Sequence, residues 1–552
     1  MKGLSVHLER LGGRLWEREN RSLVVGTVLL VLAGPVLVLA CTRHGVAIGG
    51  DGVVYVAAAR NLLHGDGLSW IGPGHDVRPL VIFGPLFPFL LSLLARLGLD
   101  PLVGARWVNA ALDGINILLF LLTLLWVTRQ VWIPLVGGVI ALLSPELLAL
   151  HAGAISEPLF LALLLASLVL LTSYLERGTR WRLVAAAVAM GLAYLTRYAG
   201  LMFAAASLVA LVLPGRGSWR TRLLAAGIYA LLFGSFAGAW MLRNHLVLGT
   251  ATSRSLSLLS PSLSLLASIG DIVTYWFLPE RLPLGLRLGA FLVVGVFLVT
   301  ARIRIRGGSA ATAPTDEAGR RRESLFCGVL VLAIVVYLGG LIASRALVVP
   351  RISIDGRILA PVNLLILLLV LTMVSGIGQA GRTRSRLTSV VVAGTFLFAI
   401  SNASRGAIRT LVLEADGQGF SSRAWQSSPL VNALRLLPLE TPIFTNEVEA
   451  LYLLADRFAY RLPTGCLPED AMTAMIVAEN CQTPEYLVWS ARMRDRIIHE
   501  RAVLAIFNNY TDQRYYAAVV PELAEGLAIL SRQGDGTLYV YDRSQWPDNP
   551  NW

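Results

Sequence analysis

The chain has 552 residues, of which 55% are hydrophobic and only 15% are charged. Soluble globular proteins carry about 25% charged residues, so this composition excludes an ordinary soluble protein and indicates a polytopic membrane protein. The formal net charge of +12 does not indicate a nucleic-acid partner, because residues 405–552 hold 13 arginines and 18 acidic residues and the positive excess lies entirely in residues 1–404.

Eleven hydrophobic stretches approach the length of about 20 residues that a helix needs to cross the bilayer core. The fifth and sixth of them are short. We expect transmembrane helices near residues 22–42, 102–128, 131–150, 158–175, 183–197, 198–213, 223–242, 285–302, 325–344, 358–377 and 387–404.

Arginine clusters predict the orientation of these helices. If the N-terminus is cytoplasmic, strict alternation brings the other main basic clusters to the same side, as the positive-inside rule requires. They lie around Arg129 and at 177–182, 216–222, 302–322 and 382–386. There they face anionic membrane lipids, which suffices to explain them. Asp51, the segment HAGAISEP and the chain after about residue 405 are then outside, in a multi-pass protein of the bacterial inner (plasma) membrane.

The apolar stretch from Pro79 to Leu97 resembles a twelfth crossing, but counting it would turn the basic clusters between 129 and 222 outward. Gly84, Pro85 and Pro88 also interrupt helix formation within it. We therefore expect a re-entrant or juxtamembrane helix, inside a first outer loop that covers about residues 43–101. The polar segment 303–324 is expected to be disordered.

The C-terminal segment 405–552 is expected to form a separate extracytoplasmic α/β domain, since its apolar runs are short. PIFTN, AVLAIF and GTLYVYDR are typical of strands, whereas PLVNALRLL and EVEALYLL are typical of amphipathic helices. Cys466 and Cys481 both lie in this segment, where oxidising conditions permit a disulfide without requiring one. This domain could recognise an acceptor, cover a site or be purely structural.

Asp51 stands about ten residues after the first span, just before a short helix that begins VVYVAAAR. A carboxylate at the membrane surface can reach both a lipid headgroup and a water-borne hydroxyl. A plainer interpretation is that Asp51 is the N-cap of this helix, and capping and catalysis do not exclude each other.

Further motifs follow in a fixed order. Asp51 and Tyr55 precede AAARNLLHG, FGPLFP follows at 83–88, SEPLF carries Glu157, LTRYAG carries Arg197, and WMLRNHLVLG carries Arg243 and Asn244. In this order, and all on the predicted outer side, the motifs resemble the GT-C superfamily of integral membrane glycosyltransferases. The branch concerned holds protein O-mannosyltransferases and the aminoarabinose transferase of lipid A, and the resemblance covers about residues 45–250.

The resemblance implies a GT-C-like transmembrane domain over residues 1–404. Its activity would be transfer of a sugar from a polyprenyl-phosphate donor to a hydroxyl of a lipid, glycan or protein acceptor. Displacement at the anomeric carbon needs a base for the acceptor proton, and Asp51 suits this role by position. Arginines suit the leaving phosphate because a guanidinium binds its oxygens bidentately. With one base placed, we expect inversion. The expected substrate-binding residues are Tyr55, His75, Arg78, Glu157, Arg197, Arg243, Asn244 and Arg357.

The chain departs from the family pattern at two places. The family often has two tandem acids in the first loop, but Gly52 follows Asp51. Without the second acid, binding of a divalent cation at Asp51 is less favourable, so we expect no metal cofactor. Asp66 or Glu157 could nevertheless complete a metal site. The family also often has a basic residue before the double proline, where this chain has Phe83. Arg78, His75 or an arginine of another loop would have to replace it.

Plainer roles remain open for the other candidates. Glu157 could complement a helix dipole, Arg243 and Arg357 could extend from span ends to the interface, and His75 could be a surface residue. Two other classes of protein also remain. A transporter or flippase of lipid-linked sugars would share the spans and buried arginines, whereas a non-catalytic, membrane-anchored assembly protein of the cell envelope would leave Asp51 dispensable.

Overall fold

The structure, a computed structural model, describes residues 18–71, 77–128, 130–213, 217–252, 255–256, 263–308, 317–349, 354–378, 385–462, 484–508, 520–521 and 523–546. Contacts between Cα atoms divide the chain into two compact units. The first, which we call the membrane unit, comprises Met1–Arg43 and Leu80–Ala415. The second, the sheet unit, comprises His44–Pro79 and Asp416–Trp552.

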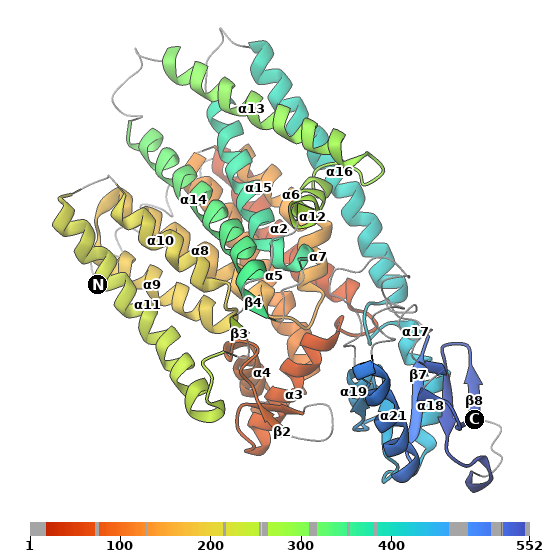
Figure 1. The fold of residues 1–552 in the computed structure, drawn as a ribbon. Coiled ribbons are helices and arrows are strands. Elements are labelled where there is room, and N and C mark those ends of the chain that lie inside the picture. The colour runs from red at the N-terminus through yellow and green to blue at the C-terminus, as the bar shows by residue number, and fades with distance from the viewer. Residues whose placement is uncertain are drawn as a thin grey trace. The chain divides into compact units, whose positions relative to one another are not determined.

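The membrane unit consists of helices and one pair of two-residue antiparallel strands, β3 (Ser255–Leu256) and β4 (Val348–Val349). Its long helices run side by side (Figure 1). In chain order the helices are α2 (Arg18–Cys41), α4 (Leu86–Arg96), α5 (Pro101–Thr128), α6 (Trp132–Leu142), α7 (Pro145–His151), α8 (Glu157–Arg177), α9 (Arg180–Thr196), α10 (Gly200–Val212), α11 (Trp219–Leu248), α12 (Leu263–Tyr275), α13 (Leu284–Gly308), α14 (Glu317–Leu347), α15 (Gly356–Gly378) and α16 (Ser385–Asp416).

Eight helices among the described residues are long and apolar enough to cross a membrane, and α6 with α7, bent by 62°, makes a ninth candidate. These nine coincide with nine of the expected spans. The fifth and sixth expected spans correspond to α9 and α10, whose 17 and 13 residues are fewer than the roughly 20 that a crossing needs. The total of eleven spans therefore stays a prediction.

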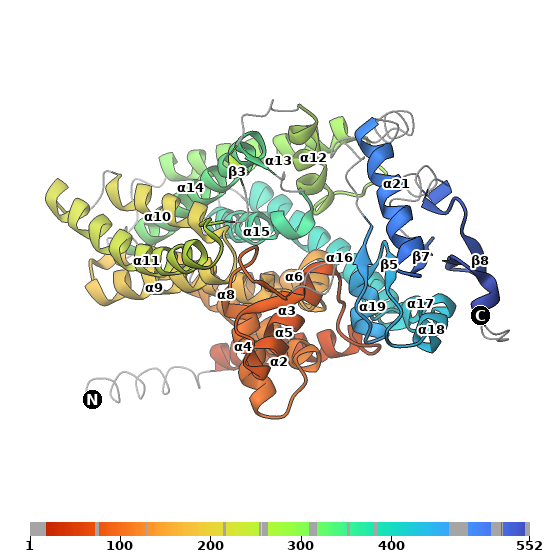
Figure 2. The same ribbon diagram turned by 60° about the horizontal axis from the view of Figure 1, so that its bottom comes forward.

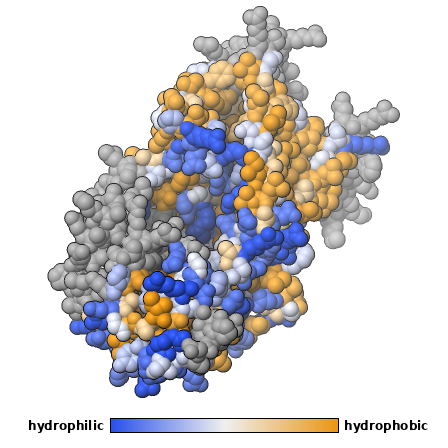
Figure 3. All heavy atoms as spheres, turned by 90° about the vertical axis from the view of Figure 1, so that its right-hand side faces the viewer, coloured by the Kyte–Doolittle hydropathy of each residue, from blue (hydrophilic) through white to orange (hydrophobic). Residues whose placement is uncertain are grey.

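The long helices of the membrane unit differ in how much of their apolar surface is buried inside the protein. The apolar windows of α8 and α15 are 61% and 72% buried, whereas those of α2, α13 and α16 are each 17% buried. Exposed aliphatic side chains such as Leu292 and Leu397 lie on these outer helices, and Figure 3 shows apolar side chains over much of this unit. Helices that are apolar all round belong in hydrocarbon, so the chain is a multi-pass membrane protein.

Two segments that connect expected spans, 79–97 and 303–324, are helical over part of their length. The stretch 79–97 holds α4, whose 11 residues make a helix of about 17 Å, roughly half the bilayer core. The expected disorder of 303–324 is wrong at both ends, because α13 runs to Gly308 and α14 begins at Glu317. The charged residues within 317–324 are part of α14. One of them, Arg322, pairs with Glu176 of α8, because its Nη2 lies 2.8 Å from the carboxylate.

The sheet unit contains a five-stranded mixed sheet in the order β6-β5-β7-β9-β8. β5 (Ile443–Thr445) is parallel to β6 (Tyr460–Arg461) and to β7 (Val503–Phe507), while β9 (Gly536–Val540) is antiparallel to β7 and to β8 (Ala528–Gln533). The helices of this part are α17 (Arg423–Gln426), α18 (Pro429–Leu436), α19 (Val448–Leu454), α21 (Pro484–His499) and the 3-10 turn η3 (Arg543–Gln545). Figure 2 shows them beside the strands. The three expected strands and two expected helices are confirmed, and β6, β8 and α21 are additional.

The central strand β7 explains why this sheet is covered on both faces. Its five residues are all buried, as expected for a continuous apolar run. Leu504 and Ile506 belong to one core cluster with Ile497 of α21, and Val503 and Phe507 to a second with residues of α18 and α19. This alternation follows from the two-residue period of a strand. Cys466 and Cys481 lie outside the described residues.

Residues 44–79 of the first outer loop belong to the sheet unit. It contributes α3 (Gly50–His64) and the hairpin of β1 (Ser69–Ile71) and β2 (Val77–Pro79). Phe420 donates its backbone N–H to the Ile48 carbonyl at 2.8 Å, and the Gln426 amide donates to the His44 carbonyl at 2.7 Å. Gly419 is required at this junction, because its φ is +61° and a Cβ would lie 2.2 Å from the Ile48 oxygen. The predicted domain boundary near residue 404 falls within α16, which continues to Asp416.

Candidate functional site

Asp51 is the second residue of α3 and is partly exposed. The N-cap is Gly49, with extended backbone angles of φ −132° and ψ −168°, so the interpretation of Asp51 as the N-cap is wrong. In the first turn its carboxylate complements the helix dipole instead. Tyr55 follows one turn later on the same helix face and is only 1% exposed, so its ring is buried.

A small cleft of about 40 Å³ lies along α3 within the sheet unit. One wall is α3 with Val53 and Ala57, and Trp70 of β1 adds an aromatic face. The opposite wall comes from α19 and β6 and contributes Tyr452, Phe458, Arg457, and the ion pair of Glu449 with Arg461. A Cβ on Gly50 would lie 3.9 Å from the Glu449 carboxylate, so the charged end of the cleft is close to the turn that carries Asp51.

The charged groups of this cleft differ in whether they bind the backbone or one another. Arg457 donates to the backbone carbonyls of Leu437 and Pro438 at 2.8 and 2.7 Å, and burial lowers the pKa of its guanidinium. It is thereby committed to the fold. Glu449 and Arg461 hold each other beside three aromatic rings, so a polar, ring-shaped ligand could find both apolar faces and charged hydrogen-bonding groups there.

Arg78 lies on β2 opposite Trp70 of β1 and is exposed. Its register places it on the hairpin that supplies one aromatic wall of the cleft. His75 lies outside the described residues.

Glu157 and Arg197 form a buried ion pair in the membrane unit. Glu157 begins α8 and is 3% exposed, and its Oε1 lies 2.7 Å from Nη1 of Arg197. Arg197 has an extended backbone (φ −148°, ψ 135°) at the break between α9 and α10. Burying one of these charges alone would be very unfavourable, so each requires the other. The structure thus brings two expected site residues together, and Glu157 orients Arg197.

Tyr198 follows Arg197 and organises a hydrogen-bond network on its other side. Its hydroxyl donates to the Val81 carbonyl at 2.5 Å and accepts from the Trp240 indole N–H at 2.9 Å. Arg243 donates to the Leu80 carbonyl at 2.7 Å and to the Asn244 side chain at 3.1 Å. The expected residues Arg243 and Asn244 therefore hold the start of the segment that leads to FGPLFP.

That segment packs tightly on the break between α9 and α10. A Cβ on Gly84 would lie 2.2 Å from the Leu195 carbonyl oxygen, so no larger residue fits without a shift. The family pattern has a proline at the position of Gly84. The close contact with Leu195 explains why this chain has a glycine there.

Arg357 lies in the first turn of α15, and its Nε is 3.4 Å from the Asp355 carboxylate. Asp355 also accepts the Ile358 backbone N–H at 2.9 Å. The Tyr337 hydroxyl of α14 donates to the Ile358 carbonyl at 2.6 Å. The start of α15 is therefore held against α14.

Sequence reasoning missed a buried pair at the base of this region. His151 lies 3.2 Å from Asp113 of α5 through Nδ1, and Asn116 approaches the other ring nitrogen at 3.0 Å. Asn116 also donates to the Pro158 carbonyl at 2.9 Å, next to Glu157. His151 is the first residue of HAGAISEP, and an aspartate and an asparagine three residues apart in an apolar helix were the signal for its partners.

No group of three or more His, Cys, Asp or Glu side chains that could hold a metal ion lies in the described part of the chain. The preference for a reaction without a metal cofactor stays a prediction.

Solved structures resemble this chain over nearly its whole length. The oligosaccharyltransferase AglB from the archaeon Archaeoglobus fulgidus, in complex with an inhibitory peptide and a dolichol-phosphate, matches with a TM-score of 0.52 and 12% identity, covering 95% of this chain and 75% of that chain. ArnT from Cupriavidus metallidurans, bound to undecaprenyl phosphate, matches with a TM-score of 0.47 and 14% identity, covering 95% and 99%. The mycobacterial arabinofuranosyltransferase AftD matches with a TM-score of 0.48 and 15% identity, covering 96% and 42%.

No protein-family model and no curated protein matches the sequence. Because the identities are 12–15%, the likeness concerns the fold alone. Of these three matches we rely on AglB, whose TM-score is above 0.5. The chain has the fold of the GT-C membrane glycosyltransferases, as its motifs led us to expect.

Proposed function

We propose that this chain is a membrane glycosyltransferase that moves a sugar from a polyprenyl-phosphate donor to an acceptor hydroxyl on the outer face of the plasma membrane. The observation that carries the proposal is a GT-C fold in which a partly exposed carboxylate, Asp51, opens the helix of the first outer loop. The dolichol-phosphate in AglB supports a lipid-phosphate donor. The arginine distribution supports an N-terminus in the cytoplasm.

In the proposed reaction Asp51 takes the proton of the acceptor hydroxyl as its oxygen attacks the anomeric carbon. The bond from that carbon to the phosphate oxygen breaks, and the polyprenyl phosphate leaves. One displacement with one base inverts the configuration. A positioned general base contributes about 100- to 10,000-fold to such a rate.

The leaving phosphate gains one negative charge in this step and departs as a dianion, and arginines can neutralise this charge. Arg197 is the best candidate in the membrane unit, because Glu157 fixes its orientation and a planar guanidinium matches phosphate oxygens. Arg357 is a second candidate at the start of α15. Arg243 is engaged with the Leu80 carbonyl, so we assign it to holding the loop.

The test is the variant Asp51→Asn in the purified, reconstituted protein, assayed with synthetic polyprenyl-phosphate sugars. We expect transfer to fall about 100-fold or more while the donor still binds. Asp100→Asn is the matched control, because Asp100 is an exposed acid at the end of the first outer loop and should leave the rate unchanged. Wild-type rates for Asp51→Asn would refute the assignment of the base.

The same preparation separates the other functions. A flippase would move labelled lipid-linked sugars across liposomes and transfer nothing. An assembly protein would do neither, and would tolerate Asp51→Asn in a complementation assay.

We further propose that the acceptor is recognised in the cleft beside α3. The cleft offers the rings of Trp70, Tyr452 and Phe458 next to the Glu449 and Arg461 pair, on the helix that carries the proposed base. Tyr452→Ala should raise the acceptor KM about tenfold and leave the donor KM unchanged. Tyr541→Ala is the control, because Tyr541 is exposed outside the cleft. An unchanged acceptor KM would exclude the cleft.

A further inference from the structure

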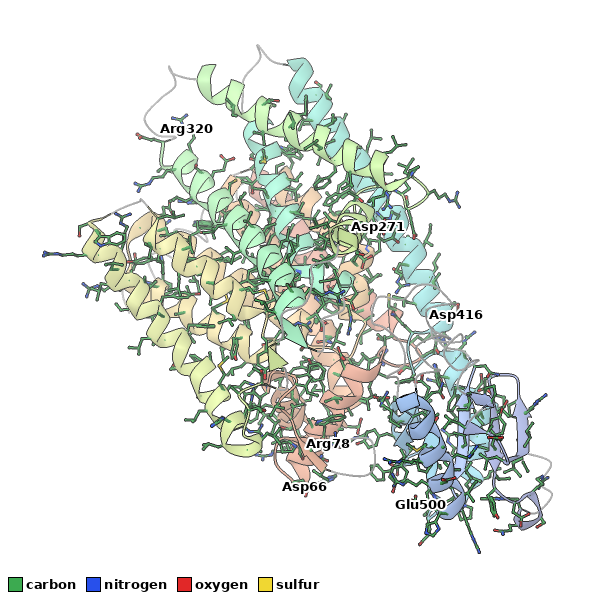
Figure 4. The ribbon with its side chains drawn as sticks, viewed as in Figure 1. Asp66, Arg78, Asp271, Arg320, Asp416 and Glu500 are labelled. Atoms are coloured by element: carbon green, nitrogen blue, oxygen red, sulfur yellow. The ribbon has the colours of Figure 1, made fainter. Side chains whose placement is uncertain are left out.

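A cavity of the membrane unit lies at the opposite ends of the helices from the Glu157 and Arg197 pair. It measures about 390 Å³ and is lined by the ends of α8 and α10 and the beginnings of α11 and α14. Figure 4 marks this end of α14 with Arg320. This volume is within the range of small-molecule sites, and none of the proposed catalytic residues lines it.

The walls of the cavity combine two chemistries. Arg222 of α11 and Arg321 of α14 contribute guanidinium groups, and Thr221 and Ser324 contribute hydroxyls. Leu211, Leu325 and Leu332 are among the aliphatic residues that form the rest. No acidic side chain lines the described wall of the cavity.

Arg222 has hydrogen-bonding capacity that the fold does not use. Its Nη1 donates to the Val212 carbonyl at 3.2 Å, and its guanidinium lies 5.5 Å from the centre of the Trp219 ring. Its Nε is buried and has no hydrogen-bond partner among the described residues. A buried N–H donor without an acceptor is unfavourable, so the fold does not fully compensate the guanidinium of Arg222, which lines the cavity.

The charge around the cavity selects the ligand. The segments 174–182, 217–225 and 317–325 carry eight arginines and three glutamates. Of the three, Glu176 is already taken by Arg322 at 2.8 Å and by Arg177 at 3.5 Å. The surroundings therefore favour an anion and offer little to the cationic group of a zwitterionic headgroup.

We propose that this cavity binds an anionic phospholipid, with its phosphate against Arg222 and Arg321 and an acyl chain along the aliphatic wall. α8, α11 and α14 are membrane-span candidates, so their ends lie at headgroup depth, where basic pockets between helices bind anionic lipids. A free phosphate would leave the aliphatic wall uncovered. The site is separate from the proposed transfer reaction.

The test measures association of spin-labelled phosphatidylglycerol and phosphatidylcholine with the reconstituted full-length protein. We expect the wild type to prefer phosphatidylglycerol, and Arg222→Gln and Arg321→Gln each to weaken that preference about fivefold. Arg220→Gln is the matched control, because Arg220 lies on the same turn of α11, is exposed and does not line the cavity.

A second variant fills the cavity without removing a charge. Gly328 lines it from α14, and a Cβ there would meet nothing within 4 Å, so Gly328→Leu should fold and expel the lipid. Equal association of both lipids, the same loss with Arg220→Gln, or retention of phosphatidylglycerol by Gly328→Leu would overturn the proposal. Displacement of the labelled lipid by millimolar inorganic phosphate alone would identify a free-anion site instead.

Discussion

At the scale of the residue, the Glu157 and Arg197 pair shows how a charge can be kept inside a membrane protein. The arginine side chain is 18% exposed and the glutamate side chain 4% exposed. Such a pair contributes little net stability over apolar residues of the same volume, but breaking it leaves an uncompensated charge. A chain that retains the pair therefore retains it for the guanidinium that it orients.

We predict that Glu157→Gln lowers stability by about 3–5 kcal/mol, because Arg197 then loses its buried counter-charge. Thermal unfolding in detergent, followed by tryptophan fluorescence, measures this. Glu525→Gln is the control, since its pair with Arg494 leaves the glutamate side chain 72% exposed and such pairs contribute about 1 kcal/mol or less.

The double variant Glu157→Gln with Arg197→Gln should lose less stability than the two single losses added together, because the charges depend on each other. An additive result would show that Glu157 does not stabilise Arg197. A Glu157→Gln protein that keeps its unfolding temperature and loses transfer would assign Glu157 to the substrate.

The break between α9 and α10 connects the loop segment 80–88 to the Glu157 and Arg197 ion pair. Tyr198 binds the Val81 carbonyl and Gly84 packs on the Leu195 carbonyl. Arg197 and Tyr198 lie at the break between these two short helices and bind different partners, Glu157 and the Val81 carbonyl.

We predict that Gly84→Ala is destabilising by about 1–3 kcal/mol, because its Cβ would overlap a backbone oxygen that cannot rotate away. Gly227→Ala is the matched control, since Gly227 lies within α11 with no atom within 4 Å of its Cβ position. It should be neutral or stabilising by up to about 1 kcal/mol. The unfolding midpoints of the two variants decide the matter, and equal midpoints would contradict the close contact.

The elements that the sequence predicts are those set by local periodicity. Long apolar runs predicted the spans, and AVLAIF predicted a buried strand because it is a short, continuous apolar run. The start of α14 was missed because its arginines resemble a solvated loop until Glu176 is placed beside Arg322. The pairing of Asp113 with His151 likewise depends on a contact between distant segments, which periodicity does not encode.

At the scale of the whole molecule, the sheet unit is assembled from two segments that are more than 300 residues apart in the chain. Residues 44–79 carry the proposed base, and residues 416–552 carry the sheet. No local pattern predicts that they associate, because Ile48 and Gly419 meet through backbone atoms alone. The proposed chemistry therefore depends on a junction that is made by backbone pairing and by the Gln426 amide, and Gly419 is the residue whose type this pairing requires.

That glycine provides the final prediction. Gly419→Ala would place a Cβ 2.2 Å from the Ile48 oxygen at a φ of +61°, so the junction should open and residues 44–79 should become sensitive to proteases, with reduced sugar transfer. Gly526→Ala separates this effect from simple backbone strain, because Gly526 has a φ of +80° and open space around it. We expect Gly526→Ala to lower the unfolding temperature slightly while residues 44–79 stay protected. If both variants expose the loop equally, or if Gly419→Ala leaves it protected, the loop does not depend on this junction and Asp51 is held by α3 packing on α19 alone.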